Sequence, residues 1–333
     1  ADWDGAIEAL ARAPEVIVAC HVNPDGDALG SLFAAALGLR ALGKEVHPTW
    51  GDEAPALPFG YQFLPGGELL VQPDDLPVCE TFLALDCGAA DRLGVVEPHM
   101  RKADVVVNVD HHPGNDNFGT YNLVVTNVSS TAELVTRMLQ DLGVAIDRDI
   151  ATNLYTGLVT DTGRFQYTNA TPDTLRLAAD LLEFGIDATA IAQEVFESSP
   201  FGYLKLLGRV LDRAVLYEDV RFVYSWLTQR DLAESGVALD ETDKLIDAIR
   251  TTRAADVAAL FKEQPDGTYR VSLRSKGPVS VGAIARSRGG GGHELAAGFT
   301  ADDVENTVLR LRDDLKSAAT TSPIHSNGHS QEK

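Results

Sequence analysis

Residues 16–31 are Val-Ile-Val-Ala-Cys-His-Val-Asn-Pro-Asp-Gly-Asp-Ala-Leu-Gly-Ser. The first five residues are apolar and predict a buried strand, so the next polar side chains, His21, Asp25 and Asp27, are expected where that strand ends. An imidazole and two carboxylates this close together favour a bound cation. Three ligands do not complete a metal shell, so later stretches are expected to bring more ligands to the same edge of a sheet.

The chain around this stretch alternates apolar runs with helix-like segments. Five runs are predicted to be strands: 16–20, 45–50, 81–85, 105–109 and 122–126. Between the first two, residues 28–43 are rich in Ala and Leu and stop at Gly43 before a lysine, which predicts a helix. This alternation predicts an α/β domain with a mostly parallel sheet and helices on both faces, whose ligand sites lie beyond the carboxyl ends of the strands.

Further helices are predicted after the fifth run. Ser130-Thr-Ala-Glu133 has the pattern of a capping box and predicts a helix that ends near Leu142, with later helices at 150–160, 172–184 and 188–197. The segment Glu197-Ser-Ser-Pro-Phe201 interrupts this series. We therefore expect a first domain of residues 1–196, followed by a linker and connecting helix at 197–214.

Residues 215–319 have a different character and predict a smaller, mixed α/β C-terminal domain. Strands are expected at 221–227, 256–261 and 269–274, and the last two are joined by the turn Gln264-Pro-Asp-Gly267. Helices are expected at 240–251, at 279–288 and from Ala301 to about Ala318. Residues 320–333 are polar and are expected to form a disordered tail.

The overall charge limits the partners that the chain can bind. Its 333 residues include 28 Lys and Arg against 49 Asp and Glu, a formal net charge of −21, which argues against binding long duplex DNA or an anionic membrane. An anionic substrate would need local positive charge. Residues 267–293 contain no Asp or Glu but carry Arg270, Arg274, Lys276, Arg286 and Arg288.

The sequence favours a cytoplasmic protein. No apolar run approaches the length of a membrane span, and Ala1-Asp-Trp-Asp lacks the basic and apolar regions of a signal peptide. The three cysteines, Cys20, Cys79 and Cys87, are widely spaced and mostly lie within apolar runs. Reduced thiols in the core are therefore expected, rather than disulfides or zinc ligands.

Three later stretches repeat the layout of residues 16–31, because each is an apolar run that ends in acidic or imidazole side chains. They supply Asp86, then Asp110 with His111 and His112, and finally Asp161. If the strands that precede the first two sets lie beside the strand 16–20, all these ligands converge at one edge of the sheet, and a helix ending at Thr160 delivers Asp161 there.

That ligand set is large enough for two metal ions about 3.5–4 Å apart, with Asp86 as the carboxylate between them. Oxygen and nitrogen ligands without thiolates favour Mn²⁺ or Mg²⁺, with Fe²⁺ or Co²⁺ as substitutes, over structural zinc.

Each of these pieces also has a purely structural interpretation. Pro24-Asp25-Gly26 has the composition of a turn, and Asp27 could cap the next helix. Asp86 could cap a loop, and His111 and His112 could be ordinary surface histidines. Ser129, Ser130 and Thr131 are typical helix-capping residues. The coincidence of ligand-type residues after several separate apolar runs favours the metal site.

The glycine run from Gly289 to Gly292, with His293, has two interpretations as well. A lone glycine run is usually a flexible turn. Here it follows the basic segment 279–288, so the backbone N–H groups of Gly290, Gly291 and Gly292 could cradle a phosphate while His293 donates a hydrogen bond. We favour phosphate or nucleotide binding.

Taken together, these motifs resemble the DHH phosphoesterase superfamily, named for the Asp-His-His found here at residues 110–112. His21, Asp25 and Asp27 resemble its first motif, Asp86 its second, and Asp161 its fourth. The run 289–293, with Arg274 and Ser275 upstream, resembles the glycine-rich motif of the DHH-associated C-terminal domain. The likeness covers nearly all of the chain except the tail.

The resemblance implies a role for each of these residues. One metal ion would be held by His21, Asp25 and Asp86, and the other by Asp27, Asp86, His111 and Asp161. Asp110 would orient a ligand, and His112 would contact the scissile phosphate. Arg274, Ser275 and the loop 289–293 would hold the far end of the substrate. The position before the glycine run is often aromatic in this family but is Arg288 here, which could favour phosphate over base stacking.

The resemblance also implies an enzyme, a two-metal and manganese-dependent phosphoesterase that hydrolyses short nucleotides to mononucleotides by metal-activated hydroxide. The similar bacterial branch acts on nano-RNA, on 3′-phosphoadenosine 5′-phosphate, and on cyclic dinucleotides and linear products such as pApA; a homodimer is suggested. The sequence does not rank these substrates. An inorganic pyrophosphatase or polyphosphatase is the alternative enzyme, and a non-catalytic nucleotide sensor is the alternative outside catalysis.

Overall fold

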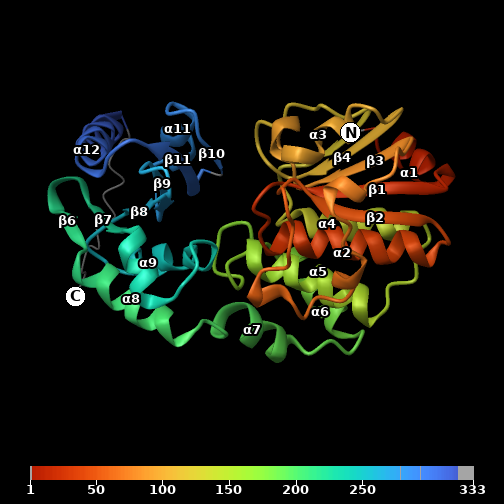
Figure 1. The fold of residues 1–333 in the computed structure, drawn as a ribbon, viewed down its shortest axis with the longest axis horizontal. Helices are drawn as coiled ribbons and strands as arrows, with labels where there is room; N and C mark the ends of the chain where they lie inside the picture. Colours follow the sequence, from red (N-terminus) through yellow and green to blue (C-terminus); the bar gives the residue numbers. More distant parts are fainter. Residues whose placement is uncertain (1, 278, 293, 322–333) are drawn as a thin grey trace, which may run out of the picture. The chain divides into compact units, whose positions relative to one another are not determined.

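The computed structural model describes residues 2–277, 279–292 and 294–321. These residues form two compact units, the first ending at Ser198 and the second beginning at Ser199 (Figure 1). Each unit has its own sheet and its own hydrophobic cores. No helix in the described part of the chain is both long enough and apolar enough to cross a bilayer.

The first unit is built on a five-stranded sheet in which all neighbouring strands are parallel. The strands are β1 (Glu15–Cys20), β2 (Glu45–Trp50), β3 (Thr81–Leu85), β4 (Val105–Asp110) and β5 (Tyr121–Val124). Their order is β2-β1-β3-β4-β5, so β1, β3 and β4 are neighbours. The predicted parallel α/β sheet is therefore confirmed.

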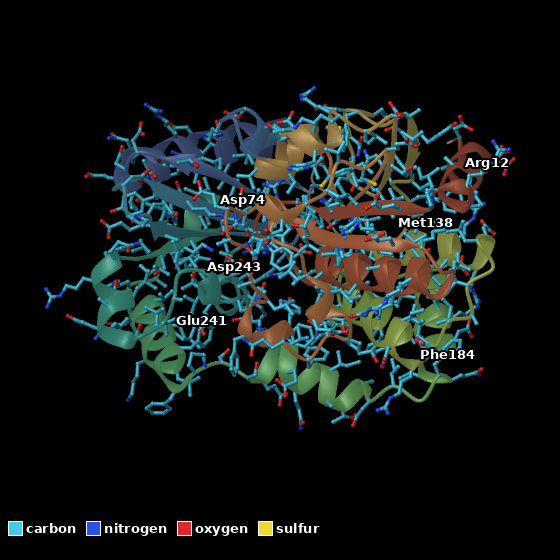
Figure 2. The ribbon with its side chains drawn as sticks, turned by 45° about the vertical axis from the view of Figure 1, so that its right-hand side comes forward. Arg12, Asp74, Met138, Phe184, Glu241 and Asp243 are labelled. Atoms are coloured by element: carbon cyan, nitrogen blue, oxygen red, sulfur yellow. The ribbon has the colours of Figure 1, made fainter. Side chains whose placement is uncertain are left out.

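Helices cover both faces of this sheet because its strands are apolar on both sides. The first face packs against α1 (Trp3–Arg12), α2 (Gly26–Ala41), α4 (Thr131–Asp141) and α5 (Arg148–Asp161). The other face packs against the short helices η4 (Ala90–Val96) and α3 (Glu97–Met100). Figure 2 labels Arg12, on α1, and Met138, on α4. The side chain of Arg12 is exposed, whereas Met138 is fully buried.

The remaining helices of the first unit are η1 (Phe59–Tyr61), η2 (Gly67–Leu69), η3 (Pro73–Asp75), α6 (Pro172–Leu182) and α7 (Ala188–Glu197). At the start of α4, the predicted capping box is only half present. Ser130 accepts the backbone N–H of Glu133, but the Glu133 carboxylate accepts the N–H and hydroxyl of Ser129 instead of the N–H of Ser130. All three cysteines are free and buried.

Helix α2 begins two residues earlier than predicted, and its cap is Asp25 rather than Asp27. The Asp25 carboxylate accepts the backbone N–H groups of Asp27 and Ala28, which places Asp27 in the first helical turn. Gly26 therefore has helical backbone and does not form the turn that we expected. A Cβ at Gly26 would lie 2.5 Å from the side chain of Thr160, so glycine allows α5 to approach.

The second unit contains a six-stranded mixed sheet of order β10-β11-β9-β8-β7-β6. Its strands are β6 (Val215–Tyr217), β7 (Phe222–Leu227), β8 (Val257–Glu263), β9 (Tyr269–Ser275), β10 (Gly291–Gly292) and β11 (Ala296–Ala301). Only β7 and β8 pair in parallel, and the other neighbouring strands are antiparallel. The predicted smaller mixed α/β domain is confirmed.

Helices pack on both faces of this sheet too. One core lies under α8 (Phe201–Asp212), α9 (Gln229–Ser235) and α10 (Leu245–Ile249). The other lies under α11 (Val281–Arg286) and α12 (Val304–Thr321). The short helices η5 (Glu218–Val220) and η6 (Asp240–Thr242) complete the unit.

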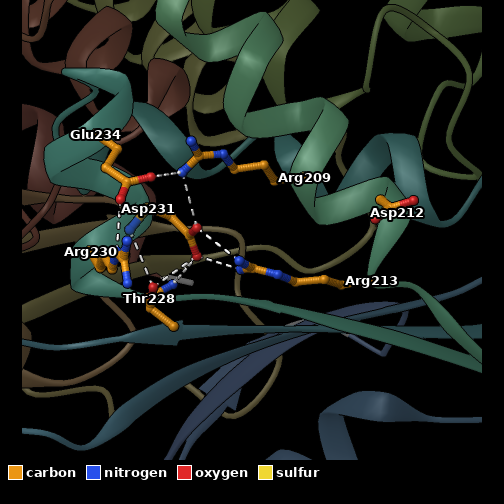
Figure 3. A pocket seen from close by; sticks show the side chains of 7 residues that line it. All are labelled: Arg209, Asp212, Arg213, Thr228, Arg230, Asp231 and Glu234. Atoms are coloured by element: carbon orange, nitrogen blue, oxygen red, sulfur yellow. Dashed lines mark hydrogen bonds and ion pairs between the residues drawn. The ribbon is translucent and has the colours of Figure 1, made fainter.

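A buried carboxylate joins α8 to α9 in this unit. Figure 3 shows Asp231 between Arg209 and Arg213, and Asp231 also accepts the N–H and hydroxyl of Thr228 at 2.9 and 2.8 Å. Asp231 is only 3% exposed. Because every polar contact of this carboxylate is charge-assisted or comes from the α9 cap, the network ties the two helices together.

Two predicted helices of the second unit differ from the structure in their bounds. The helix expected at 240–251 is split into η6 and α10, and Asp243 between them pairs with buried Lys262 of β8. Residues 296–301 form β11, whereas the terminal helix starts at Val304 and continues to Thr321. The expected tail 320–333 lies, from residue 322 on, outside the described residues.

Candidate metal centre

Three neighbouring parallel strands end at one edge of the first unit's sheet, and metal-binding side chains follow each of them. His21 follows β1, Asp86 follows β3, and Asp110 ends β4 with His111 directly after it. The structure brings these side chains together, as the sequence predicts. The strand order changes direction between β1 and β3, and this is where open α/β sheets bind their ligands.

His21, Asp25 and Asp86 form one group whose ligand atoms all lie within 4.8 Å of one another. His21 Nε2 is 3.5 Å from Asp86 Oδ2, and both side chains are buried. Asp25 is exposed and also caps α2. Its capping role and its place in this group are compatible, because capping uses only one carboxylate oxygen, Oδ1.

Asp27, His111 and Asp161 form a second group within the same 4.8 Å limit. His111 Nε2 is 3.8 Å from Asp27 Oδ2 and 3.6 Å from Asp161 Oδ2. Asp27 and His111 are buried. Asp161 is the last residue of α5, so a helix delivers it to the sheet edge as predicted.

Asp86 faces both groups. Its Oδ2 faces His21, and its Oδ1 is 3.8 Å from His111 Nε2, so one carboxylate reaches toward both sides. Its backbone φ is 58°, in the left-handed region that non-glycine residues seldom adopt. A strained residue at the end of a central strand is typical of functional sites.

The N-terminus of α4 holds the carboxylates of Asp27 and Asp86 in place. Thr131 and Ala132 donate their backbone N–H groups to Asp27 at 2.6 and 2.9 Å, where the helix dipole favours negative charge. The Thr131 hydroxyl donates to Asp86 Oδ1 at 2.8 Å. The sequence interpretation of Thr131 as a helix cap misses this contact with two candidate ligands.

Asp110 and His112 form a pair beside Asp86. His112 Nδ1 is 2.7 Å from Asp110 Oδ1 and 3.5 Å from Asp86 Oδ1. Asn115 donates to the second oxygen of Asp110 at 2.6 Å and to the carbonyl of Cys87 at 3.0 Å. The Asp110 side chain is fully buried and that of His112 is 27% exposed, so Asp110 orients an imidazole that solvent can reach.

Two asparagines that hold Asp110 and Asp161 in place are not predicted from the sequence. Asn115 holds Asp110, and Asn169 contacts Asp161 Oδ2 at 3.3 Å while donating to the carbonyl of Ser129 at 2.8 Å. Both lie in loops where asparagine is common, and no spacing in the sequence links them to the acidic motifs.

The two carboxylates of the second group, Asp27 and Asp161, are costly to ionise in this environment. Burial raises the pKa of Asp27 well above its usual value, and the negative charges of Asp86 and Asp161 raise it further. Burial likewise raises the pKa of Asp161, and nearby Asp25 and Asp86 add to the effect. Burial lowers the pKa of His111, which favours a neutral imidazole with a free lone pair.

The neighbours of Asp86 lower its pKa, whereas those of Asp27 and Asp161 raise theirs. Burial alone would raise the pKa of Asp86, but the hydrogen bond with His21 and the positive charge of His112 hold it well below its usual range. Burial would lower the pKa of His112, yet its hydrogen bond to Asp110 and the charge of Asp86 raise it to about 9.

These residues fit two divalent cations. The donors are carboxylate oxygens and imidazole nitrogens, the set that suits manganese, magnesium or iron. Burial, together with repulsion among the aspartates, raises the pKa of Asp27 and Asp161, and a cation would offset the cost of ionising them. A carboxylate that faces both groups is the feature that a pair of ions requires.

The predicted substrate contacts of the second unit lie on and after β9. Arg274 donates from Nη1 to the carbonyl of Leu273 at 3.0 Å, and its Nε is 4.0 Å from Asp247 Oδ1. Ser275 is buried, and its hydroxyl accepts the N–H of Gly277 at 3.3 Å. His293 lies outside the described residues.

The glycine run differs from the phosphate cradle that we expected. The N–H groups of Gly289 and Gly290 bond to the carbonyls of Arg286 and Ala285, so they are already used at the end of α11. Gly291 and Gly292 form the exposed edge strand β10. A Cβ at Gly290 would lie 2.1 Å from the carbonyl oxygen of Gly298, so close strand packing explains this glycine.

Arg288 also differs from the expectation that it could bind phosphate. Its guanidinium pairs with Asp314 of α12, donates to the carbonyl of Ile284 at 3.0 Å and lies 5.5 Å from the ring of Phe299. With its charge neutralised by Asp314, Arg288 acts as a packing residue between α11, α12 and β11.

Two family models match the chain. Residues 15–158 match the DHH family, N-terminal domain, and residues 219–320 match the DHHA1 domain. The first match contains most residues of the candidate metal centre but ends before Asp161.

Curated relatives and solved structures match along almost the whole chain. The bifunctional oligoribonuclease and PAP phosphatase NrnA of Thermus thermophilus is 35% identical over 286 residues, which is 86% of this chain and 83% of that protein. The Bacillus subtilis protein of the same name is 28% identical over 92% of this chain and 96% of its own.

An exopolyphosphatase-related protein from Bacteroides fragilis has the same fold, with a TM-score of 0.86 and 23% identity over 95% of this chain and 97% of its own. The predicted family is therefore confirmed: the chain belongs to the DHH phosphoesterase family, with an N-terminal DHH domain followed by a DHHA1 domain.

Proposed function

We propose that this protein is a metal-dependent phosphoesterase that hydrolyses short nucleotides to mononucleotides. The observation that carries the proposal is the convergence of five candidate ligands on Asp86, which faces both groups. Support also comes from the relatives in Thermus and Bacillus, which are named as oligoribonucleases and PAP phosphatases. A Geobacillus relative, named as a cyclic-di-AMP phosphodiesterase, is 27% identical over 93% of this chain but only 48% of its own length.

In this proposal His21, Asp25 and Asp86 hold one ion, and Asp27, Asp86, His111 and Asp161 hold the other. Enzymes of the DHH family use divalent metal ions. Manganese is the ion that we propose, with magnesium, cobalt or iron as substitutes, because the donors are oxygen and nitrogen. When bound, the two ions would polarise the phosphoryl group and lower the pKa of water.

The protein's own side chains then position the substrate. His112, oriented by Asp110, is proposed to donate a hydrogen bond to an oxygen of the scissile phosphate. Thr131 keeps the Asp86 carboxylate facing both groups. Hydrolysis forms a bond between phosphorus and the oxygen of water and breaks the bond from phosphorus to the 3′ oxygen. The proton that water loses is balanced by the proton gained on that 3′ oxygen.

The proposed substrates are linear dinucleotides such as pApA, nano-RNA, cyclic dinucleotides and 3′-phosphoadenosine 5′-phosphate. In the second unit, Arg274, Ser275, Gly291, Gly292 and His293 are proposed to contact the part of the substrate that is not cleaved. Arg274 and the exposed β10 glycines lie in the basic segment of the chain. We propose a cytoplasmic homodimer, as the resemblance suggests; light scattering of the purified protein tests the dimer.

The Asp86→Ala variant tests the mechanism. In manganese buffer it should release no measurable AMP from pApA, because both groups lose a ligand. Asp104→Ala, at the start of β4 and therefore at the opposite edge of the sheet, should keep wild-type turnover. Near-normal turnover by Asp86→Ala would contradict the proposal.

The same assay, extended to several substrates, separates the alternatives. Faster release of phosphate from pyrophosphate than of AMP from pApA would favour an inorganic pyrophosphatase or polyphosphatase. Binding of pApA without any product in manganese buffer would favour a nucleotide sensor.

A further inference from the structure

Arg92 is a cationic side chain beside the first ligand group. It lies on η4, between β3 and β4 in the chain, and its side chain is exposed. Its Nη2 is 3.2 Å from Nδ1 of His21. Among the residues that the structure describes, Arg92 has no carboxylate within ion-pair distance, although the protein as a whole is strongly acidic.

The backbone fixes Arg92 in this position. Val22, directly after His21, donates its N–H to the carbonyl of Arg92 at 2.9 Å, and Val95 donates to the carbonyl of Gly51 at 3.0 Å. Gly94 has a φ of 51°, and a Cβ there would lie 2.3 Å from the Gly51 carbonyl oxygen. The η4 segment is therefore held tightly against the loop that carries His21.

The hydrogen bonding of His21 leaves the Arg92 guanidinium with unused donors. His21 Nδ1 is 2.8 Å from the carbonyl oxygen of Val22, which can only accept, so Nδ1 carries the ring proton. Nε2 is the atom that faces Asp86, and a metal ion would take the place of the proton that Nε2 shares with that carboxylate. A protonated Nδ1 cannot accept a hydrogen bond from Arg92.

A guanidinium whose N–H donors have no carboxylate partner is suited to bind an anionic ligand. Arginine presents a planar fork of donors that matches two oxygens of a phosphate group. Arg92 is anchored by its backbone rather than by a carboxylate, so binding a phosphate would break no ion pair of the described residues.

We propose that Arg92 binds a non-bridging oxygen of the substrate phosphate beside His21, and that it is a substrate-binding residue of the DHH domain. This inference rests on the proposed function, because it assumes that a phosphoester occupies the candidate metal centre. It assigns the first unit a cationic phosphate contact in addition to His112.

Arg92→Gln tests the inference. Its kcat/KM for pApA in manganese buffer should fall roughly 10- to 100-fold, the loss expected for hydrogen bonds to a charged group. Arg92→Lys should fall less, because it keeps the charge but not the fork. Arg101→Gln is the matched control, since Arg101 is an exposed arginine at the C-cap of α3 that pairs with Glu97. It should retain wild-type activity.

Two further measurements distinguish a phosphate contact from a structural role. Arg92→Gln should bind as much manganese per chain as the wild type, and Arg92→Ala should regain activity in low, non-denaturing guanidinium chloride. Loss of manganese from Arg92→Gln, or activity of Arg92→Gln within about twofold of the wild type, would overturn the inference.

Failure of the proposed function can be distinguished from failure of the inference about Arg92. If the wild type cleaves none of the nucleotides, the proposed function is wrong, and calorimetry with inorganic phosphate on the manganese-loaded protein then decides on Arg92. At least a tenfold weaker phosphate affinity in Arg92→Gln supports the phosphate contact, and equal affinity in both proteins refutes it.

Discussion

Thr131 contacts two carboxylates of the candidate metal centre through two different groups. Its backbone N–H bonds to Asp27 and its hydroxyl to Asp86. A change of the Thr131 side chain keeps the backbone contact with Asp27 and can remove only the hydroxyl contact with Asp86. Residues that orient metal ligands commonly affect metal affinity or activity by about 10- to 100-fold.

Thr131→Val should therefore lower the turnover of pApA about 10- to 100-fold, because valine keeps the shape of threonine but cannot donate to Asp86. Thr131→Ser keeps a hydroxyl and should stay within a few-fold of the wild type. The measurement is kcat/KM as a function of manganese concentration. Equal activity of the valine and serine variants would show that the hydroxyl is not used.

Asp231 makes the stability of the second unit depend on pH. The hydrogen bond from Arg213 lowers the pKa of Asp231 below its usual value. A carboxyl whose pKa is lower in the folded state stabilises fully above its unfolded pKa of about 3.9, and this contribution is lost as the pH falls toward the folded pKa.

Asp231→Asn should therefore lower the free energy of unfolding by about 2–3 kcal/mol at pH 7, where the charged hydrogen bonds are intact. The difference from the wild type should shrink at pH 3. Urea unfolding at both pH values, followed by fluorescence, measures it. An equal difference at pH 7 and pH 3 would contradict the role of the charge.

The sequence predicts the candidate ligands because each follows an apolar run. His21, Asp86 and His111 are found this way, and the strand order explains why they meet. Thr131 and Asn115 are not found, because a hydrogen bond to a residue far away in the chain leaves no local pattern. Arg92 is missed for the same reason, since its significance depends on the tautomer of His21.

Among the elements, α2 and α5 pack unusually closely. A Cβ at Gly30 of α2 would lie 2.4 Å from the carbonyl oxygen of Asn153 and 2.9 Å from the backbone nitrogen of Gly157, both on α5. These backbone atoms cannot move aside without displacing α5. Since α5 ends at Asp161, this packing also positions a candidate ligand.

Gly30→Ala should destabilise the first unit by about 1–3 kcal/mol through overpacking, and should weaken manganese binding by shifting α5. Gly208, on α8, is the matched control, because a Cβ there meets nothing within 4 Å. Gly208→Ala should stabilise the second unit by about 0.5–1 kcal/mol. Chemical unfolding measures both; a neutral Gly30→Ala would contradict the close packing.

The elements that the sequence does not predict are those with weak local signals. Strand β11 has the sequence Ala-Ala-Gly-Phe-Thr-Ala, which lacks the run of β-branched residues that marks β1 and β4 of the first unit. It becomes a strand because it pairs with β9 along its full length. The break between η6 and α10 likewise depends on Asp243 pairing with Lys262, a tertiary contact.

For the molecule as a whole, the two units should respond differently to metal. All candidate ligands lie in the first unit, and binding to the folded state alone stabilises it by about 2.7 kcal/mol at 100 times the dissociation constant. Manganese should therefore raise the melting temperature of the first unit by roughly 5–10 °C relative to chelator, and leave that of the second nearly unchanged.

Scanning calorimetry with manganese and with chelator measures this difference, and Asp86→Ala should lose most of the shift. Equal shifts of both transitions would indicate nonspecific binding. No shift in the wild type would contradict a metal centre of useful affinity.

The most direct test of the central claim is anomalous diffraction from a crystal of the wild-type protein grown with manganese. The predicted result is two manganese peaks about 3.5–4 Å apart, one beside His21 and Asp25, the other beside Asp27, His111 and Asp161, with Asp86 contacting both. A single peak, or peaks away from Asp86, would contradict a two-metal centre in this protein.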